Sequence, residues 1–152
     1  MNDTWRGLSI VVISGVLTYI LSQLFTEFVL RPIQEYKILK AKVAKQLVLY
    51  AQYYANPAPN TDVEKYPRWS AASDEIRELA AEVAAFTEIK PRRWFVFYAI
   101  PKKQDLLEAS SNLIGLSNAF FTTGNFETHS RIEFIEYRKT IKKKMRITER
   151  KE

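Results

Sequence analysis

The stretch GLSIVVISGVLTYILSQLFT, residues 7–26, organises the chain, because it holds no charged residue between Arg6 and Glu27. As an α-helix rising about 1.5 Å per residue it is about 30 Å long, which matches the hydrocarbon thickness of a bilayer. We therefore predict a transmembrane helix. The alternatives are a buried helix of a soluble domain and a cleaved signal peptide. The run is long for a signal core, Asp3 lies in its head, and no A-x-A-like site follows it.

One face of the predicted helix carries small and hydroxyl-bearing side chains. Positions four apart share a helix face, and the recurring residues are Ser14, Thr18, Ser22 and Thr26. In lipid, such a stripe lets another helix approach closely and offers interhelical hydrogen bonds. We therefore expect self-association through this stripe or, in a ring of copies, a narrow polar pore lined by it. The alternative is that each hydroxyl bonds back to its own helix.

Basic residues are distributed unevenly around the span. Arg6 lies before it, beside Asp3. Five basic residues follow it closely: Arg31, Lys37, Lys40, Lys42 and Lys45. Basic residues within about 15–20 residues of a span favour the cytoplasmic side. We therefore expect an outward amino terminus and a cytoplasmic domain after Leu30.

The composition limits the chemistry that the chain can perform. Its 152 residues carry 23 lysines and arginines against 17 acids, a net charge of +6. This excess indicates an anionic partner, either phospholipid headgroups or nucleic acid, or else serves only to orient the span. The chain has no cysteine, which excludes disulfides and thiolate metal sites, and a single histidine, His129. We expect no metal and no cofactor.

After the span, apolar residues recur at helical spacing, so we predict an all-α fold. The single transmembrane helix is followed by a cytoplasmic bundle of about four helices. These are expected over residues 28–54, 70–89, 101–121 and 126–147. Pro32 either opens the first of them or kinks one long helix. The proline-rich segment 56–68 reads as an exposed loop.

The apolar stripes also predict the core of the bundle. The predicted core residues are Val43, Leu47, Ile76, Leu79, Val83, Leu106, Leu113, Ile114 and Phe120. From the last helix, inward packing is expected of Ile132, Phe134, Ile135 and Ile141. The chain then divides into an outward terminus and span over residues 1–31, a bundle over 32–147 and a basic tail over 148–152.

Two basic segments are candidate anion sites. KPRRWFVFYAIP, residues 90–101, has three interpretations: a buried connector, an interfacial segment with rings at headgroup level, or a nucleic-acid surface. The segment 138–151 holds eight basic residues and one acid. The alternative to an anion site is a solvated tail whose cations are electrostatically favourable at the end of a helix. The candidate side chains are Lys90, Arg92, Arg93, Arg138, Lys139, Lys142, Lys143 and Lys144.

The sequence contains no constellation that indicates an enzyme. It lacks a glycine-rich phosphate loop, G-x-S-x-G, H-E-x-x-H and any second histidine. His129, between Thr128 and Ser130, reads as a surface histidine. Acid pairs such as Glu133 and Glu136 fit a solvated helix face. We therefore expect no catalytic residues.

Three segments after the span carry a resemblance to known proteins: RPIQEYKILKAKVAKQLVLYAQYYANP from Arg31, ASDEIRELAAE from Ala72 and EASSNLIGLSN from Glu108. The layout resembles the small one-pass effectors of bacterial antiphage systems, some of which form membrane channels with helical domains that sense a nucleic-acid or nucleotide signal. It also looks like the HEPN-type bundles of some CRISPR accessory membrane proteins. The HEPN ribonuclease signature needs an arginine shortly before a histidine. The nearest arginine before His129 is Arg93, so the resemblance implies a bundle without nuclease chemistry.

Taken together, we expect a homo-oligomeric effector or channel of the bacterial inner membrane, acting in antiphage defence and regulated by an anionic nucleic-acid or nucleotide ligand. The expected partners are further copies of the chain, membrane lipid, single-stranded nucleic acid or a nucleotide, and a cytoplasmic protein. The alternative is a membrane-tethered adaptor that recruits a cytoplasmic partner and conducts nothing. A membrane-bound nuclease is the third reading.

Overall fold

The computed structural model describes residues 2–55, 58–59, 66–89, 99–122 and 129–148. Its elements are α1 (Asn2–Phe25), the π-helix η1 (Thr26–Leu30), α2 (Arg31–Leu49), α3 (Ala51–Ala55), β1 (Ala58–Pro59), α4 (Tyr66–Ile89), α5 (Lys103–Asn118), β2 (Phe121–Thr122) and α6 (His129–Lys144). The predicted all-α class with a long apolar amino-terminal helix is confirmed. Among these residues the one pairing between strands is a two-residue parallel contact that joins Ala58 to Phe121 and Pro59 to Thr122.

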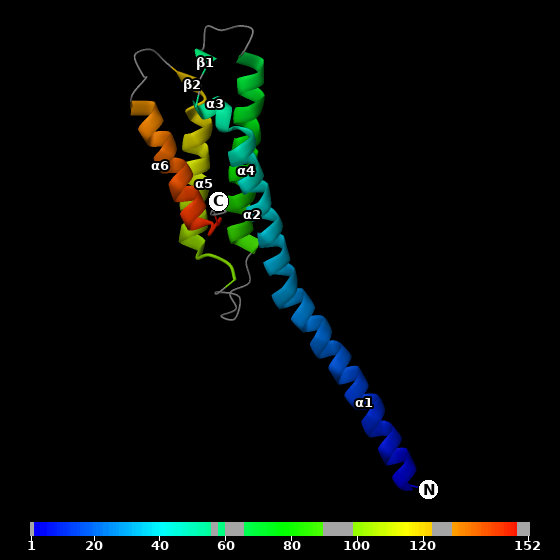
Figure 1. Cartoon of the computed structure of the whole chain (residues 1–152). Coiled ribbons are helices and arrows are strands. Elements are labelled where there is room, and N and C mark those ends of the chain that lie inside the picture. Colours follow the sequence, from blue (N-terminus) through cyan, green and yellow to red (C-terminus); the bar gives the residue numbers. More distant parts are fainter. Residues whose placement is uncertain (1, 56–57, 60–65, 90–98, 123–128, 149–152) are drawn as a thin grey trace.

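The elements α1, η1 and α2 form one continuous rod, and the other helices pack beside its second half (Figure 1). Pro32 explains the π-helical turn in the middle of this rod. Proline has no N–H to donate, and its ring would clash with the carbonyl four residues earlier. In η1 the Arg31 N–H instead donates to the Thr26 carbonyl, five residues back. The helix therefore passes through the proline by widening one turn.

The core of the bundle lies between α2, α4, α5 and α6. Its buried side chains include eight of the predicted core residues. These are Val43, Leu47, Ile76, Leu79, Val83, Leu106, Leu113 and Phe120. The prediction for Ile114 is wrong, because 45% of this side chain is exposed. Ile135 is also wrong, with 69% exposed, since Phe134 and Ile141 occupy the inward face of α6 instead.

Helices α4 and α5 approach closely because small side chains lie between them. Ser110, at 6% exposure, donates a hydrogen bond of 2.8 Å to the Ala80 carbonyl across the interface. Ser73 likewise donates to the Ser117 carbonyl, at 3.2 Å. Each hydroxyl has a hydrogen-bond acceptor inside the core, so burying it is not costly.

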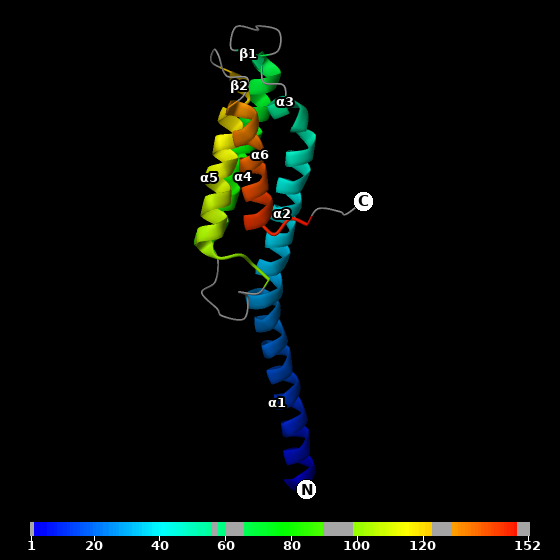
Figure 2. The ribbon, with the colours of Figure 1, turned by 60° about the vertical axis from the view of Figure 1, so that its left-hand side comes forward.

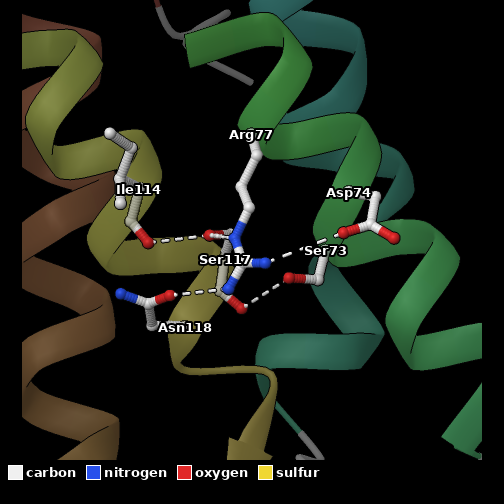
Figure 3. Close-up of polar contacts among 6 residues, drawn as sticks. All are labelled: Ser73, Asp74, Arg77, Ile114, Ser117 and Asn118. Atoms are coloured by element: carbon white, nitrogen blue, oxygen red, sulfur yellow. Dashed lines mark hydrogen bonds and ion pairs between the residues drawn. The ribbon is translucent and has the colours of Figure 1, made fainter. Parts of the chain in front are cut away.

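A second polar cluster closes the same interface near the carboxyl end of α5 (Figure 3). The guanidinium of Arg77 on α4 donates to Ser117 Oγ at 3.3 Å and to Asn118 Oδ1 at 3.0 Å. It also forms an ion pair of 3.7 Å with Asp74. A cation at the carboxyl end of a helix is electrostatically favourable. Arg77 therefore fixes the register between α4 and α5.

Candidate membrane span and basic surface

The amino-terminal part of the rod is the one segment of the described residues long and apolar enough to span a membrane. None of its apolar window is buried inside the protein. Exposed apolar side chains cover it on every side, among them Val12, Ile13, Val16 and Leu17. A core helix of a soluble protein would bury one face against its neighbours. The lateral surface of this helix is instead available to lipid or to another helix.

The hydroxyl stripe lies along this exposed helix, and its hydroxyls are partly satisfied within it. Ser14 Oγ donates to the Val11 carbonyl at 2.9 Å, and Thr18 Oγ1 donates to the Ser14 carbonyl at 2.8 Å. Thr26 Oγ1 donates to the Ser22 carbonyl at 3.0 Å. Within a single chain the stripe therefore follows the alternative in which hydroxyls bond back to their own helix. The small side chains of the stripe leave a narrow surface at which a neighbouring helix would approach closely.

Glycine adds to this surface. A Cβ placed on Gly15 would meet nothing within 4 Å in the chain. By contrast, a Cβ on Gly115 would lie 3.0 Å from the Tyr137 ring. Packing within the chain thus explains the small residue at position 115 but not the one at position 15.

The first charged side chains after the apolar run lie at the π-helical turn. Arg31 Nη1 pairs with Glu27 at 2.9 Å, and Arg31 Nε pairs with Glu35 at 3.3 Å. Hydrogen bonding to Glu27 is the main cause of a raised pKa for the Arg31 guanidinium, with Glu35 adding to it. The two carboxylates offset the charge of Arg31 where the apolar run ends.

The predicted anion-binding residues of the last helix differ in pairing and in exposure. Lys144 forms ion pairs with Asp105 at 3.0 Å and Glu108 at 2.8 Å, so its charge is used within the bundle. Hydrogen bonding to Glu108 and Asp105 raises the pKa of Lys144, and the hydrogen bond from Lys144 lowers the pKa of Asp105. Arg138 and Lys142 are partly buried, whereas Lys139 and Lys143 are exposed. The candidates Lys90, Arg92 and Arg93 lie outside the described residues.

The end of α6 is held by a well-defined turn. Arg146 adopts the left-handed conformation, with φ of 54°. The Ile147 N–H donates to the Lys142 carbonyl at 2.8 Å, and the Arg146 N–H donates to the Lys143 carbonyl at 3.2 Å. This is the hydrogen-bond pattern of a Schellman motif, which usually has glycine at the left-handed position. It turns the chain so that Met145 is fully buried and Ile147 packs against the core.

That turn is joined to α2. The Tyr36 hydroxyl donates to the Met145 carbonyl at 2.6 Å. Desolvation by burial raises the pKa of Tyr36 to about 12, because a charged phenolate is disfavoured there. Figure 2 shows the end of α6 (red) beside the lower turns of α2, toward the end of the bundle from which α1 departs. Sequence patterns did not reveal this contact, since the sequence gives no signal for a bond between a tyrosine and a remote carbonyl.

Polar side chains also join α2 to α4, and the sequence analysis missed these links. Lys42 pairs with Glu82 at 2.8 Å. Gln46 donates to Glu75 Oε2 at 3.0 Å, and the Tyr50 hydroxyl donates to the same oxygen. Residue spacing does not indicate which acids Lys42 and Gln46 meet, because those acids lie on another helix. The rod is therefore fastened to the bundle by both core packing and polar contacts.

Within the residues that the structure describes, no group of three or more His, Cys, Asp or Glu side chains could hold a metal ion. The charged clusters around Arg77, Lys144 and Glu75 are pairings that join helices. Comparisons of the chain with protein families, with curated proteins and with solved structures find no match. The site to be explained is thus an exposed apolar helix fused to a bundle with a basic end.

Proposed function

We propose that this protein is a homo-oligomeric membrane effector or channel whose cytoplasmic bundle controls its membrane helix. The observation that carries the proposal is the continuous rod from α1 through η1 into α2. Core residues of the bundle, among them Val43 and Leu47, lie on that same rod. A movement of the bundle is transmitted to α1 without a flexible joint.

Oligomerisation is part of the proposal, because one helix cannot enclose a pore. The bilayer gives no hydrophobic drive for helix association, so close packing of small side chains has to supply it. The stripe Ser14, Thr18, Ser22 and Thr26, together with Gly15, provides such small side chains along α1 and the start of η1. In a channel the same stripe lines the lumen.

The regulating ligand in this proposal is anionic, a nucleic acid or a nucleotide, and the biological role is antiphage defence in the bacterial inner membrane. The net charge of +6 and the basic end of α6 support an anionic ligand. The layout of one span followed by a helical bundle supports the defence role and a HEPN-like arrangement without nuclease chemistry. The amino terminus faces outward and the bundle is cytoplasmic.

The test is a triple substitution, Ser14→Leu, Thr18→Leu and Ser22→Leu, made in the full chain. Leucine favours insertion, so the span stays in the membrane. Oligomer mass in detergent and ion leakage from liposomes should both fall. The matched control is Val12→Leu, Val16→Leu and Ile20→Leu, which has the same spacing on about the opposite face. The proposal is wrong if the stripe variant keeps both its oligomer mass and its conductance.

A second candidate function is a membrane-tethered adaptor without conductance. It is favoured by apolar side chains that the bundle leaves exposed on α2, namely Ile38 at 60% and Val48 at 70%. An adaptor would use such side chains to hold a cytoplasmic protein. In that case the stripe variant would still recruit its partner, whereas the pair Ile38→Ser and Val48→Ser would lose it. Conductance by the wild-type protein in liposomes would rule the adaptor out.

A further inference from the structure

The basic half of α6 lies toward the membrane side of the bundle. Figure 1 and Figure 2 both show α6 ending at the end of the bundle nearer α1. The hydrogen bond between Tyr36 and Met145 fixes this position. Tyr36 comes ten residues after Thr26, so it stands about 15 Å beyond the apolar run along the helix axis.

This height places α6 near lipid headgroups. The headgroup layer extends about 5–8 Å beyond the hydrocarbon on each side of a bilayer. The remaining gap to the Met145 carbonyl is then roughly 8 Å, about one Debye length at physiological ionic strength. In addition, a tyrosine side chain on a helix leans toward the amino terminus, which here means toward the membrane.

The basic residues at this end of α6 lie on backbone that contacts with the bundle keep in place. We define the α6 basic surface as Lys139, Lys142, Lys143 and Arg146. The Schellman turn, the burial of Met145 and the packing of Ile147 keep their backbone in place. The side chains of Lys139 and Lys143 are exposed and share a helix face, being four residues apart.

The distribution of acids sharpens the charge of this surface. No acidic residue occurs from Tyr137 to Thr148. The two acids that approach from α5, Asp105 and Glu108, pair with Lys144. No ion pair joins Lys139 or Lys143 to an acid among the described residues. The acids of α6, Glu133 and Glu136, lie in its other half, farther from α1.

We propose that the α6 basic surface binds anionic phospholipid headgroups of the leaflet into which the carboxyl end of α1 emerges, and so docks the bundle on the membrane. The inference rests on the proposed membrane span of α1. It assigns this part of the predicted anion site to lipid, because α6 ends about one Debye length from the headgroup layer. Each lysine near an anionic surface changes the ratio of docked to undocked protein by about fivefold.

The experiment uses the full chain in nanodiscs of neutral phosphatidylcholine, with or without phosphatidylglycerol. The chain has no cysteine, so Thr148→Cys provides a single site for a fluorophore beside the surface. Energy transfer to a headgroup dye reports docking. We expect higher transfer with phosphatidylglycerol, and loss of the difference at high salt, because salt screens charges.

Matched double variants separate this surface from charge in general. Lys139→Gln with Lys143→Gln should lower the lipid-dependent docking ratio about 25-fold. Lys45→Gln with Arg68→Gln removes the same charge from the half of the bundle farther from α1 and should leave docking unchanged. Equal transfer in the two lipids, or equal loss in the two variants, overturns the lipid assignment. So does a single-stranded oligonucleotide that binds the wild-type protein in neutral nanodiscs but not the Lys139/Lys143 variant.

Insertion is measured separately, as flotation with liposomes after an alkaline wash. Protein that floats but shows no dependence on phosphatidylglycerol contradicts the α6 surface alone. Protein that does not float contradicts the membrane span, and with it both proposals.

Discussion

The hydroxyl of Tyr36 donates a hydrogen bond of 2.6 Å to the main-chain carbonyl of Met145, 109 positions later in the chain. Tyr36 is near the start of α2, and Met145 follows the last turn of α6. This contact joins the start of α2, near the middle of the rod, to the turn that follows α6. Any change that loosens it should separate the motion of α6 from that of α1.

We predict that Tyr36→Phe destabilises the bundle by about 1–3 kcal/mol, because the buried Met145 carbonyl would lose its donor. The measurement is urea unfolding of the full chain in detergent, followed by circular dichroism. Tyr66→Phe is the control, since this side chain is 45% exposed and keeps its ring contact with Phe121. Equal stability of the two variants would show that the Tyr36 hydroxyl does not stabilise the bundle.

Neighbouring residues on α5 provide a test of the core. Leu113 is fully buried, whereas Ile114 is 45% exposed. Leu113→Ala should cost about 2–5 kcal/mol through lost burial and a residual cavity. Ile114→Ala should stay within about 0.5 kcal/mol, as surface substitutions usually do. A cost below about 0.5 kcal/mol for Leu113→Ala would mean that α5 does not pack as described.

The pH dependence of stability should report the Lys144 ion pairs. The pKa of Asp105 is lowered by its bond to Lys144, so this group contributes stability that is present above its unfolded pKa of about 3.9. That contribution is lost as the pH falls through the lower folded value. The difference in melting temperature between wild type and Lys144→Met should therefore be full at about pH 7 and shrink below about pH 4.

Lys139→Met is the control for this titration, because Lys139 forms no ion pair with a described residue. It should change the melting temperature little at either pH. The stability that comes from the raised pKa of Lys144 is fully present at acid and neutral pH and is lost only as the pH rises through its folded value, so it does not vary over the range of this titration. A Lys144→Met deficit that does not vary with pH would contradict the pairing.

Gly115 should be needed for the contact between α5 and α6. A Cβ there would lie 3.0 Å from Tyr137 Cζ and 3.2 Å from two further ring atoms. We expect Gly115→Ala to destabilise the wild-type bundle, because the ring has to move. In a Tyr137→Ala background the same change should stabilise it by about 0.5–1 kcal/mol, the ordinary gain of alanine over glycine in a helix. An equal effect in both backgrounds would exclude the steric explanation.

Topology can be tested with two reporters fused at the carboxyl end. The basic residues after the span, beginning with Arg31 and Lys37, predict a cytoplasmic carboxyl end. A reporter fused after Glu152 should therefore be active as a cytoplasmic reporter, and a periplasmic reporter there should be silent. Periplasmic activity would reverse the orientation and place the α6 basic surface on the outer face.

The fold was more predictable than the site. Periodicity identified the inward stripe of α2 and most of the core of α4 and α5, because burial of one face imposes a spacing of three and four. It failed at Ile114 and Ile135, where an apolar residue lies beside the buried stripe. Hydrophobicity alone cannot separate a buried position from its neighbour one residue away on a helix.

The hydroxyl stripe was found in the sequence, but its hydrogen bonds were not. Ser14 and Thr18 donate to carbonyls of their own helix. Such bonds depend on the side-chain rotamer, which residue spacing does not fix. The basic residues of α6 were also predicted, yet their spacing does not separate Lys144 from Lys143.

The sequence by itself determined the long uncharged helix, the all-α class and the charge excess, because each depends on local composition and on period. Only the tertiary structure decided that Lys144 forms ion pairs with acids of α5, whereas Lys139 and Lys143 are exposed to solvent. Asp105 and Glu108 reach Lys144 because α5 and α6 pack side by side. The contact between Tyr36 and Met145 likewise turns the basic end of α6 toward the membrane helix. Such contacts join residues far apart in the chain, so they exist only once the core has brought the helices together.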